Sequence, residues 1–428
     1  MTALVHRTDR GVVREARVCR TSCAREDTVD PGGSGAHATA GGHAAGGTPA
    51  PRVIKGGRGG RGKRIGIFWS FLCGGGVETV NRDIADRLPR DQYIVDAFVW
   101  QAEETFVGLA ESFDELVVLD QPFEPIGQPG SGPFTPIEQC ASFQKLLTER
   151  HYDLFIVSCC WAPFWLVHMH GIPIIEFWHG FGCWNGFDMP SQAIVAVSQT
   201  TRGQIEAIRP SHAPVTVIRN AVEADRYAGA SARRGEARKR FGLPPEAPVV
   251  LYCGRFSAEK RPQDAMAAFV KARETRPDLQ LLMVGTIMPG WSDYYVQMGT
   301  DLGLRWGVDA WHYVLPHDEI GLAFAAADVM LHPSEWEGLG MVLLEGLSAE
   351  LPIISTCAGG CGEVLDGVAV KVAVGDTEAM AEAINGLLGN ARKREAMRRA
   401  GQERVRESFG IEAWGKQIEA VVGGVIGD

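Results

Sequence analysis

Short apolar segments alternate with segments of helical composition along most of this 428-residue chain, and the alternation occurs twice. The first series runs over residues 64–218 and the second over residues 249–408. Strands that are apolar at nearly every position, with helices between them, are typical of a parallel sheet covered on both faces. The sequence therefore predicts an α/β protein with two doubly wound, Rossmann-like domains that face each other across a cleft.

Four segments follow from this pattern. We expect a disordered tail over residues 1–63, a first domain over 64–222, a second domain over 223–410, and a C-terminal helix over 411–428 that packs back on the first domain. The tail consists mainly of Gly, Ala, Pro, Thr and Arg and has little to bury. Its removal is therefore expected to leave activity and stability nearly unchanged.

The expected elements can be placed by residue number. Strands are predicted at 64–68, 93–99, 115–119, 154–158, 172–177, 193–197, 215–218, 249–252, 281–284, 312–315, 329–331 and 353–355. Helices are predicted at 77–88, 138–149, 200–208, 233–241, 262–276, 319–326, 341–347, 378–389, 392–408 and 411–422.

Charge and cysteine content exclude several classes of function. Residues 1–63 carry a net charge of +6, which leaves −16 for the remainder of a chain whose formal charge is −10. An acidic body argues against nucleic acid as a partner. No apolar stretch is long enough to span a membrane, and the tail lacks the apolar core of a secretory signal. The ten cysteines show no metal-ligand spacing, so we expect free thiols, no structural zinc and a cytoplasmic location.

Two carboxylates flank a glycine turn in the second domain. Glu337 precedes Gly338–Gly340 (Gly-Leu-Gly), and Glu345 lies one turn inside the helix that follows. The unpaired N–H groups of a helix start attract anions, whereas carboxylates at that place suit the neutral hydroxyls of a sugar or ribose. The alternative is a structural one, in which one Glu interacts with the helix dipole and the other is a solvated helix residue.

A second cluster follows the first strand of the second domain. Gly254 permits a tight turn there, Arg255 can clasp a phosphate with two parallel hydrogen bonds, and Lys260 adds a compact positive charge. A nucleoside diphosphate leaving group needs such neutralisation, particularly without a metal. The alternative is a surface Arg/Lys pair at the start of a helix that has Pro262 in its first turn.

These two clusters, in this order, resemble the C-terminal domain of retaining glycosyltransferase family 4. The resemblance extends from about Arg64 to Gly423. Its motifs are GGGVETVNRDIA (74–85), AIVAVSQTTRGQI (193–205), VIRNAVEADRY (217–227), LYCGRFSAEKRPQDAMAAF (251–269), SEWEGLGMVLLEGLSAELPIIST (334–356) and GGCGEVLDG (359–367). Two departures are Leu339, where the family usually has Phe, and a shortened stretch over residues 179–193.

The resemblance implies the GT-B fold, a nucleotide-sugar donor, retention at the anomeric carbon, and no metal or other cofactor. Arg255 and Lys260 would hold the diphosphate, assisted across the cleft by the backbone of Gly75 and Gly76. Glu345 would bind the ribose hydroxyls.

Glu337 would hold the donor sugar as a catalytic residue, together with the backbone N–H groups of Gly338, Leu339, Gly340 and Met341. His179, at the end of a first-domain strand, would lie near the sugar as a second catalytic residue, although a histidine among aromatic residues is often structural. Trp178 and Trp184 are predicted to line the acceptor pocket, and core packing is the alternative for both.

The sequence thus predicts a retaining hexosyltransferase. The donor would be a UDP-sugar rather than a GDP-sugar, and the acceptor a hydroxyl of a small, soluble molecule. Basic amphipathic helices are not evident in the first domain, so peripheral membrane contact is not favoured. A retaining disaccharide phosphorylase of the same fold and an inactive sugar-nucleotide-binding scaffold are the two alternatives.

Overall fold

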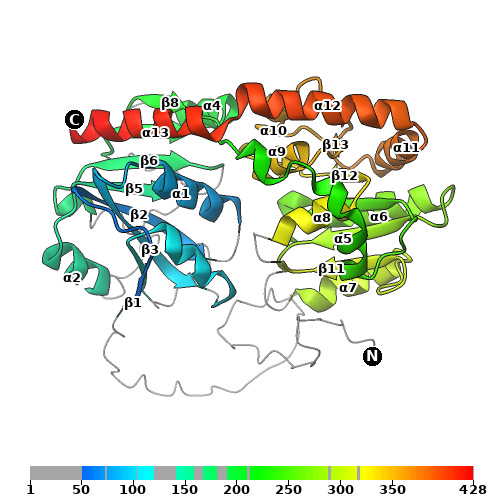
Figure 1. Ribbon diagram of the computed structural model, residues 1–428, viewed down its shortest axis with the longest axis horizontal. Helices are drawn as coiled ribbons and strands as arrows, with labels where there is room; N and C mark the ends of the chain where they lie inside the picture. Colours follow the sequence, from blue (N-terminus) through cyan, green and yellow to red (C-terminus); the bar gives the residue numbers. More distant parts are fainter. Residues whose placement is uncertain are drawn as a thin grey trace, which may run out of the picture.

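The computed structural model describes residues 51–72, 75–102, 104–119, 141–158, 167–180, 190–209, 213–287, 291–315 and 319–427. These residues form two α/β halves, each built on its own sheet, and two long C-terminal helices run across both (Figure 1). This arrangement confirms the predicted fold class.

The first sheet has eight strands in the order β1-β4-β3-β2-β5-β6-β7-β8. All neighbours are parallel except the pair β1 and β4, which is antiparallel. Its strands are β1 (Arg52–Lys55), β2 (Lys63–Leu72), β3 (Tyr93–Ala102), β4 (Glu115–Val118), β5 (Leu154–Ser158), β6 (Ile174–Trp178), β7 (Ala193–Ala196) and β8 (Val215–Val217). Its α-helices are α1 (Gly76–Arg87), α2 (Ala141–Glu149) and α4 (Gln199–Ile208), and the 3₁₀ helix η1 spans Glu104–Ser112.

The second sheet has six parallel strands in the order β11-β10-β9-β12-β13-β14. Its strands are β9 (Val249–Cys253), β10 (Gln280–Val284), β11 (Ala310–Tyr313), β12 (Val329–His332), β13 (Ile353–Ser355) and β14 (Ala369–Lys371). Its helices are α5 (Arg234–Phe241), α6 (Pro262–Arg273), α7 (Ser292–Asp301), α8 (Ile320–Ala326), α9 (Met341–Ser348), α10 (Cys361–Leu365) and α11 (Thr377–Leu388). The short 3₁₀ helices η3 (Ala224–Arg226), η4 (Ala230–Arg233) and η5 (Ala258–Lys260) lie in the connections.

Burial explains why these strands could be predicted. Every residue of β5, β6, β9, β10 and β12 is buried, as expected for strands covered on both faces. Four elements, β1, β14, α7 and α10, are short or weakly apolar and were not predicted from the sequence.

The boundary of the predicted tail is wrong. Residues 51–63 do not belong to a disordered tail, because β1 pairs with β4 from Arg52↔Val118 to Lys55↔Glu115. The Gly-rich composition concealed this strand, whose stability comes from backbone hydrogen bonds rather than from apolar burial: Val53 remains 41% exposed.

Arg58 fixes the segment that follows β1. Its side chain is 2% exposed, and it donates hydrogen bonds to the carbonyl oxygens of Ala85 (3.0 Å) and Leu88 (2.8 Å) at the end of α1. It also contacts the carbonyl oxygen of Tyr93 and lies 3.2 Å from the carboxylate of Asp114. One buried guanidinium therefore joins residues 51–63 to α1 and β3.

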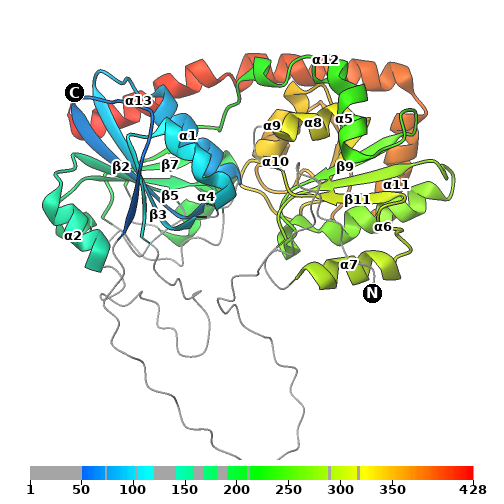
Figure 2. The same cartoon turned by 60° about the horizontal axis from the view of Figure 1, so that its bottom comes forward.

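The last two helices join the two halves. α12 (Ala391–Ser408) lies along the second half, and α13 (Ile411–Ile426) packs against α1 of the first (Figures 1 and 2). Where the chain returns, Val222 and Gly410 form a parallel bridge, and the N–H of Val222 donates to the carbonyl oxygen of Phe409 at 3.0 Å. The two connections between the halves thus lie side by side.

Candidate active site in the interdomain cleft

A cleft of about 630 Å³ lies between the two halves. Its walls include the start of α1 from the first half and the loops after β9, β10 and β12 from the second. The carboxyl ends of parallel strands meet at one edge of a sheet, so these loops converge on the same place. Of the predicted site residues, the cleft is lined by Gly75, Gly76, His179, Arg255, Lys260, Glu337, Gly338, Leu339, Gly340, Met341 and Glu345.

Glu337 lies in the turn between β12 and α9 and is 7% exposed. Its Oε1 atom lies 2.5 Å from Nζ of Lys260, at the end of η5. Burial opposes ionisation of this carboxyl group, but the charge of Lys260 and a hydrogen bond from His332 outweigh it and lower the pKa of Glu337 to about 2. Glu337 is therefore a carboxylate at physiological pH.

A buried polar network orients Glu337. The same Oε1 atom lies 3.1 Å from Nε2 of His332 and accepts a hydrogen bond from Oγ of Ser334 at 3.1 Å. On the other side of the ring, Oγ of Ser355 lies 3.5 Å from Nδ1 of His332. Lys260, His332 and Ser334 thus converge on one oxygen of Glu337 and fix its position in the cleft. His332 was not predicted from the sequence, although its place at the carboxyl end of a buried strand was an available signal.

Arg255 and Lys260 differ in their surroundings. Lys260 is largely buried against Glu337, whereas the side chain of Arg255 is 56% exposed and lies 3.7 Å from Oε1 of Glu259. A long, exposed ion pair of this kind contributes little to stability. The guanidinium of Arg255 is thus at the rim of the cleft and can turn towards an anion.

Two helix starts face each other near these cations. α1 begins after Gly75, whose N–H donates to Oε2 of Glu78 at 2.9 Å, and α9 begins after Gly340. Gly340 has a φ of 89°, a conformation that glycine adopts without strain. A Cβ atom on Gly76 would lie 3.3 Å from Cγ of Met341, so the two helix starts approach closely. Helix starts bring unpaired N–H groups and favour anions.

Glu345 lies one turn inside α9 and is 4% exposed. Tyr227 donates a hydrogen bond to its Oε1 atom at 3.2 Å. Burial raises the pKa of Glu345 to about 7, against the lowering effects of Tyr227 and the nearby Arg226. Glu345 thus titrates in the physiological range, which the sequence does not reveal.

His179 stands where the two halves touch. A Cβ atom on Gly338 would lie 1.8 Å from the carbonyl oxygen of His179, and one on Gly180 would lie 2.5 Å from the ring of Trp336. The imidazole lies 3.3 Å from Oγ of Ser158 and stacks on Phe177 with ring centroids 4.9 Å apart. Its removal from water lowers the pKa of His179 to about 3, so the side chain is neutral.

The prediction that Trp178 lines an acceptor pocket is wrong. Its side chain is 1% exposed and donates a hydrogen bond at 3.0 Å to the buried carboxylate of Glu176, which also pairs with Arg209. Side chains alternate between the two faces of a strand, and Trp178 points away from the face that its neighbour Phe177 occupies. Trp184 lies outside the described residues. The aromatic residues that do line the cleft include Trp69 and Trp336, which the sequence analysis did not select.

Glu363 of α10 forms a contact between the halves that the sequence analysis also missed. Its Oε1 atom accepts hydrogen bonds from the N–H groups of Gln199 (2.7 Å) and Thr200 (3.2 Å) at the start of α4. Its Oε2 atom accepts from Nε of Arg219 at 2.7 Å. A carboxylate of the second half therefore caps a helix of the first.

Replacing Glu363 by alanine is expected to lower the free energy of unfolding by about 1–2 kcal/mol, since both the helix cap and the ion pair are lost. Glu412→Ala is the control, because it removes an ion pair to Arg87 whose carboxylate is 79% exposed and that contributes at most about 1 kcal/mol. Chemical denaturation measures both. Equal losses in the two variants would contradict the assignment of Glu363 as a clasp between the halves.

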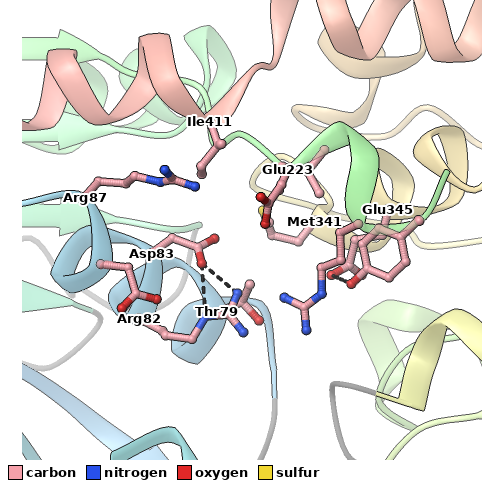
Figure 3. A pocket seen from close by; sticks show the side chains of 12 residues that line it. Thr79, Arg82, Asp83, Arg87, Glu223, Met341, Glu345 and Ile411 are labelled. Carbon is pink, nitrogen blue, oxygen red and sulfur yellow. Dashed lines mark hydrogen bonds and ion pairs between the residues drawn. The ribbon is translucent and has the colours of Figure 1, made fainter. Parts of the chain in front are cut away.

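A second cavity of about 260 Å³ lies behind Glu345, beside the two connections. Figure 3 shows Thr79, Arg82, Asp83 and Arg87 of α1 facing Glu223, Met341 and Glu345 across it. Arg82 is paired with Asp83 at 2.6 Å. Acidic and basic side chains alternate on its walls, so this cavity has no clear preference for an anion.

Metal ligands and membrane spans can be assessed within the described ranges. No group of three or more His, Cys, Asp or Glu side chains there is arranged to hold a metal ion. In the same residues, no helix has both the length and the apolar character that a bilayer crossing requires. Cys253, Cys357 and Cys361 are free thiols.

Both halves match known sequence families. Residues 74–226 match the family described as Glycosyltransferase Family 4, and residues 233–404 match Glycosyl transferases group 1. Together these matches cover most of the chain from the start of α1 to α12.

Curated relatives are similar over parts of the chain. A glycogen synthase of Mycobacterium tuberculosis is 30% identical over 224 residues, which are 51% of each protein. A 2-deoxystreptamine glucosyltransferase of Streptomyces kanamyceticus is 31% identical over 46% of this chain and 51% of its own length. The chain therefore spans about half the length of these relatives. A D-inositol 3-phosphate glycosyltransferase of Catenulispora acidiphila is 25% identical over 81% of this chain and 90% of its own.

Solved structures share the fold. HepE of Anabaena, in complex with UDP and glucose, covers 85% of this chain and all of its own with a TM-score of 0.69 and 19% identity. A sucrose-phosphate synthase of Thermosynechococcus elongatus covers 85% of this chain and 99% of its own, with a TM-score of 0.68 and 18% identity. At such identities the likeness establishes the fold alone.

Proposed function

Because this chain belongs to glycosyltransferase family 4 and has the GT-B fold, we propose that it is a retaining hexosyltransferase. It would move a sugar from a nucleotide donor, a UDP-sugar rather than a GDP-sugar, to a hydroxyl of a small acceptor. The observation that carries this proposal is the pairing of Lys260 with Glu337 in the cleft at 2.5 Å. A cation for the leaving phosphate and an acid for the sugar thus lie side by side.

The donor diphosphate would lie between the two helix starts. Arg255 and Lys260 would neutralise it from the second half, and the backbone at Gly75 and Gly76 would approach it from the first. This distribution of charge needs no metal ion, and we propose that none is required.

The sugar and ribose would contact the two acids. Glu337, held as a carboxylate, would accept hydrogen bonds from the sugar hydroxyls, and Glu345 would accept them from the ribose. HepE of Anabaena was solved with UDP-glucose bound in this fold, which supports a UDP-sugar as donor. Free thiols at Cys253, Cys357 and Cys361 suit a reducing, cytoplasmic compartment.

The proposed reaction exchanges one bond for another on the same face of the sugar. The bond between the anomeric carbon and the phosphate oxygen breaks, and the acceptor oxygen bonds to that carbon from the same side. The acceptor's proton passes to the departing phosphate oxygen. Both carboxylates have partners within the protein. Glu337 is paired with Lys260, and Glu345 accepts a hydrogen bond from Tyr227. Neither is assigned as a nucleophile.

A screen of nucleotide sugars tests the proposal. A UDP-sugar at 100 times its Kd should stabilise the folded protein by about 2.7 kcal/mol, and an acceptor should then cause release of UDP. Nuclear magnetic resonance of the product reports the anomeric configuration, and inversion would refute retention. Phosphate-dependent release of the sugar without any nucleotide would instead identify a disaccharide phosphorylase.

The binding of the nucleoside diphosphate should depend on pH through Glu345. With a pKa of about 7, about one tenth of the Glu345 carboxyl group is ionised at pH 6 and most of it at pH 8. Because the ionised form is the better acceptor for ribose hydroxyls, UDP should bind about tenfold more tightly at pH 8 than at pH 6. A terminal phosphate of UDP also ionises near pH 6, so wild type and Glu345→Gln have to be compared by isothermal titration. The contribution of Glu345 is the difference between the pH dependences of their Kd values. The same pH dependence in both proteins would count against the contact with ribose.

The stability of the folded protein should depend on pH in the opposite direction, because the contribution of Glu345 falls as the pH rises. The folded chain keeps the Glu345 proton at pH values at which the unfolded chain has released it, because its pKa is raised from 4.5 to about 7. This contribution to stability is fully present below pH 4.5 and is lost as the pH rises through about 7. Glu345→Gln should remove this part of the pH dependence of unfolding.

A further inference from the structure

The positive charges of the cleft belong to one side of it. Among the described residues that line it, the only Lys and Arg are Arg255 and Lys260, both from the second half. The first half contributes Trp69, His179, Gly180 and Asn220, and residues 75–79 at the start of α1. Of these, only Glu78 is charged. The half of the cleft opposite the phosphate-neutralising cations therefore has no cation among these residues.

Four arginines of the first half form ion pairs and do not line the cleft. Arg58 is bound to Asp114, Arg64 to Asp96 and Arg150 to Glu115, and Arg209 is bound to Glu176. None of these four pairs is part of the cleft lining. Moving any of them towards a ligand would leave a carboxylate without its partner.

His179 adds no positive charge to the first half of the cleft, because its pKa is lowered to about 3 by removal from water.

Aromatic side chains line this part of the cleft. The ring of Trp69 is 2% exposed, and its Nε1 atom has no hydrogen-bond partner in the part of the chain that the structure describes. Across the cleft, the ring of Trp336 packs against Gly180. A buried N–H group without a partner is costly unless a ligand or a water accepts from it. Aromatic rings with a polar N–H suit molecules that present both C–H faces and hydroxyls.

We propose that the acceptor is a polyhydroxylated ring, such as a sugar or cyclitol, that carries no phosphate or carboxylate group. This inference rests on the proposed transferase function and names its second substrate by chemical class. An anionic group in this half of the cleft would lose its water without gaining a cation, which is strongly unfavourable. A ring that is neutral or bears an amino group meets no such penalty. The indole N–H of Trp69 would donate to one of its hydroxyls.

Matched acceptor pairs test this proposal in the full chain. Each pair is a ring and its phosphate ester: myo-inositol with D-inositol 3-phosphate, and glucose with glucose 6-phosphate, with 2-deoxystreptamine as an amine-bearing ring. Product formation from the UDP-sugar gives kcat/KM for each at physiological ionic strength, which screens exposed charges. We expect at least one uncharged or amine-bearing ring to be used, with kcat/KM about 100-fold or more above that of its phosphate ester.

Two results would overturn the proposal. One is equal or better use of the phosphate esters. The other is failure of every ring in the panel while the enzyme still binds UDP and slowly hydrolyses the UDP-sugar without an acceptor. Hydrolysis of the UDP-sugar tests the proposed transferase function and does not depend on the acceptor class. Failure of the acceptor proposal can therefore be distinguished from failure of the proposed function.

Trp69→Phe provides a second measurement, because it keeps an aromatic ring and removes the N–H donor. The KM for the acceptor should rise about tenfold, while the Kd for UDP stays within about twofold. A purely structural role of Trp69 would instead change both quantities together or neither, and such a result would count against the acceptor contact.

Discussion

Lys260→Ala is expected to lower turnover by about 100-fold or more, because it removes a charge that neutralises the phosphate as it leaves. It also releases Glu337, whose pKa of about 2 depends on Lys260. With the ion pair lost, burial is opposed only by the remaining contact with His332, so the pKa of that carboxyl group rises. The acid assigned to the donor sugar would then be held less firmly, so two effects act in the same direction.

Arg255→Ala is the matched variant. Its side chain is 56% exposed and pairs only distantly with Glu259, so the folded protein should lose at most about 1 kcal/mol of stability. Its turnover should nevertheless fall by about 100-fold, and Arg255→Lys should restore only part, because lysine lacks the bidentate fork.

Steady-state kinetics with and without EDTA, combined with thermal unfolding, measure these effects. Breaking a buried ion pair can destabilise a protein by about 3–5 kcal/mol, so Lys260→Ala has to be compared at a temperature at which it is folded. Full activity in Arg255→Ala, or a strict need for added Mg²⁺, would refute the assignment of these residues to a metal-independent diphosphate site.

Removing residues 1–63 should destabilise the protein by about 3–5 kcal/mol, whereas removing residues 1–50 should have little effect. The longer deletion takes away β1 and Arg58, and it leaves the carbonyl oxygens of Ala85 and Leu88 and the carboxylate of Asp114 without their buried donor. Each buried polar group that loses its partner costs about 1–3 kcal/mol.

Thermal unfolding of four proteins separates the contributions. The full chain and the chain lacking residues 1–50 should melt at nearly the same temperature, and the chain lacking residues 1–63 should melt about 4–6 °C lower. Arg58→Ala in the full chain should account for most of that difference. Identical melting of the two truncated chains would show that β1 and Arg58 are dispensable.

The repeated alternation of strands and helices was sufficient to predict the fold. In β5, β9 and β12 every side chain is buried, so hydrophobicity marks the strand directly. β1 has no such hydrophobic pattern, because half of its side chains face solvent and its pairing with β4 uses backbone hydrogen bonds. Backbone pairing leaves little trace in composition, and the boundary of the tail was misplaced for that reason.

The candidate site was only partly predictable. Glu337, Glu345 and Lys260 follow from local motifs, but the contact between Lys260 and Glu337 joins loops after two different strands. Trp178 was predicted to line the acceptor pocket, but side chains alternate between the faces of a strand. Trp178 therefore lies on the face opposite Phe177. Trp336 could be recognised only once the two halves were in contact, since its partner Gly180 belongs to the other half.

The return of the chain to the first half has a consequence for dissecting this protein. Ile411, Trp414, Ile418 and Val422 of α13 are buried in the core that also contains Ile84 and Leu88. A fragment that ends at residue 222 would therefore expose an apolar groove along α1, and it should be poorly soluble when produced alone. A synthetic peptide covering residues 411–427 should rescue it in trans. The first half is thus assembled from segments near both ends of the chain, and a fragment of it has to contain both.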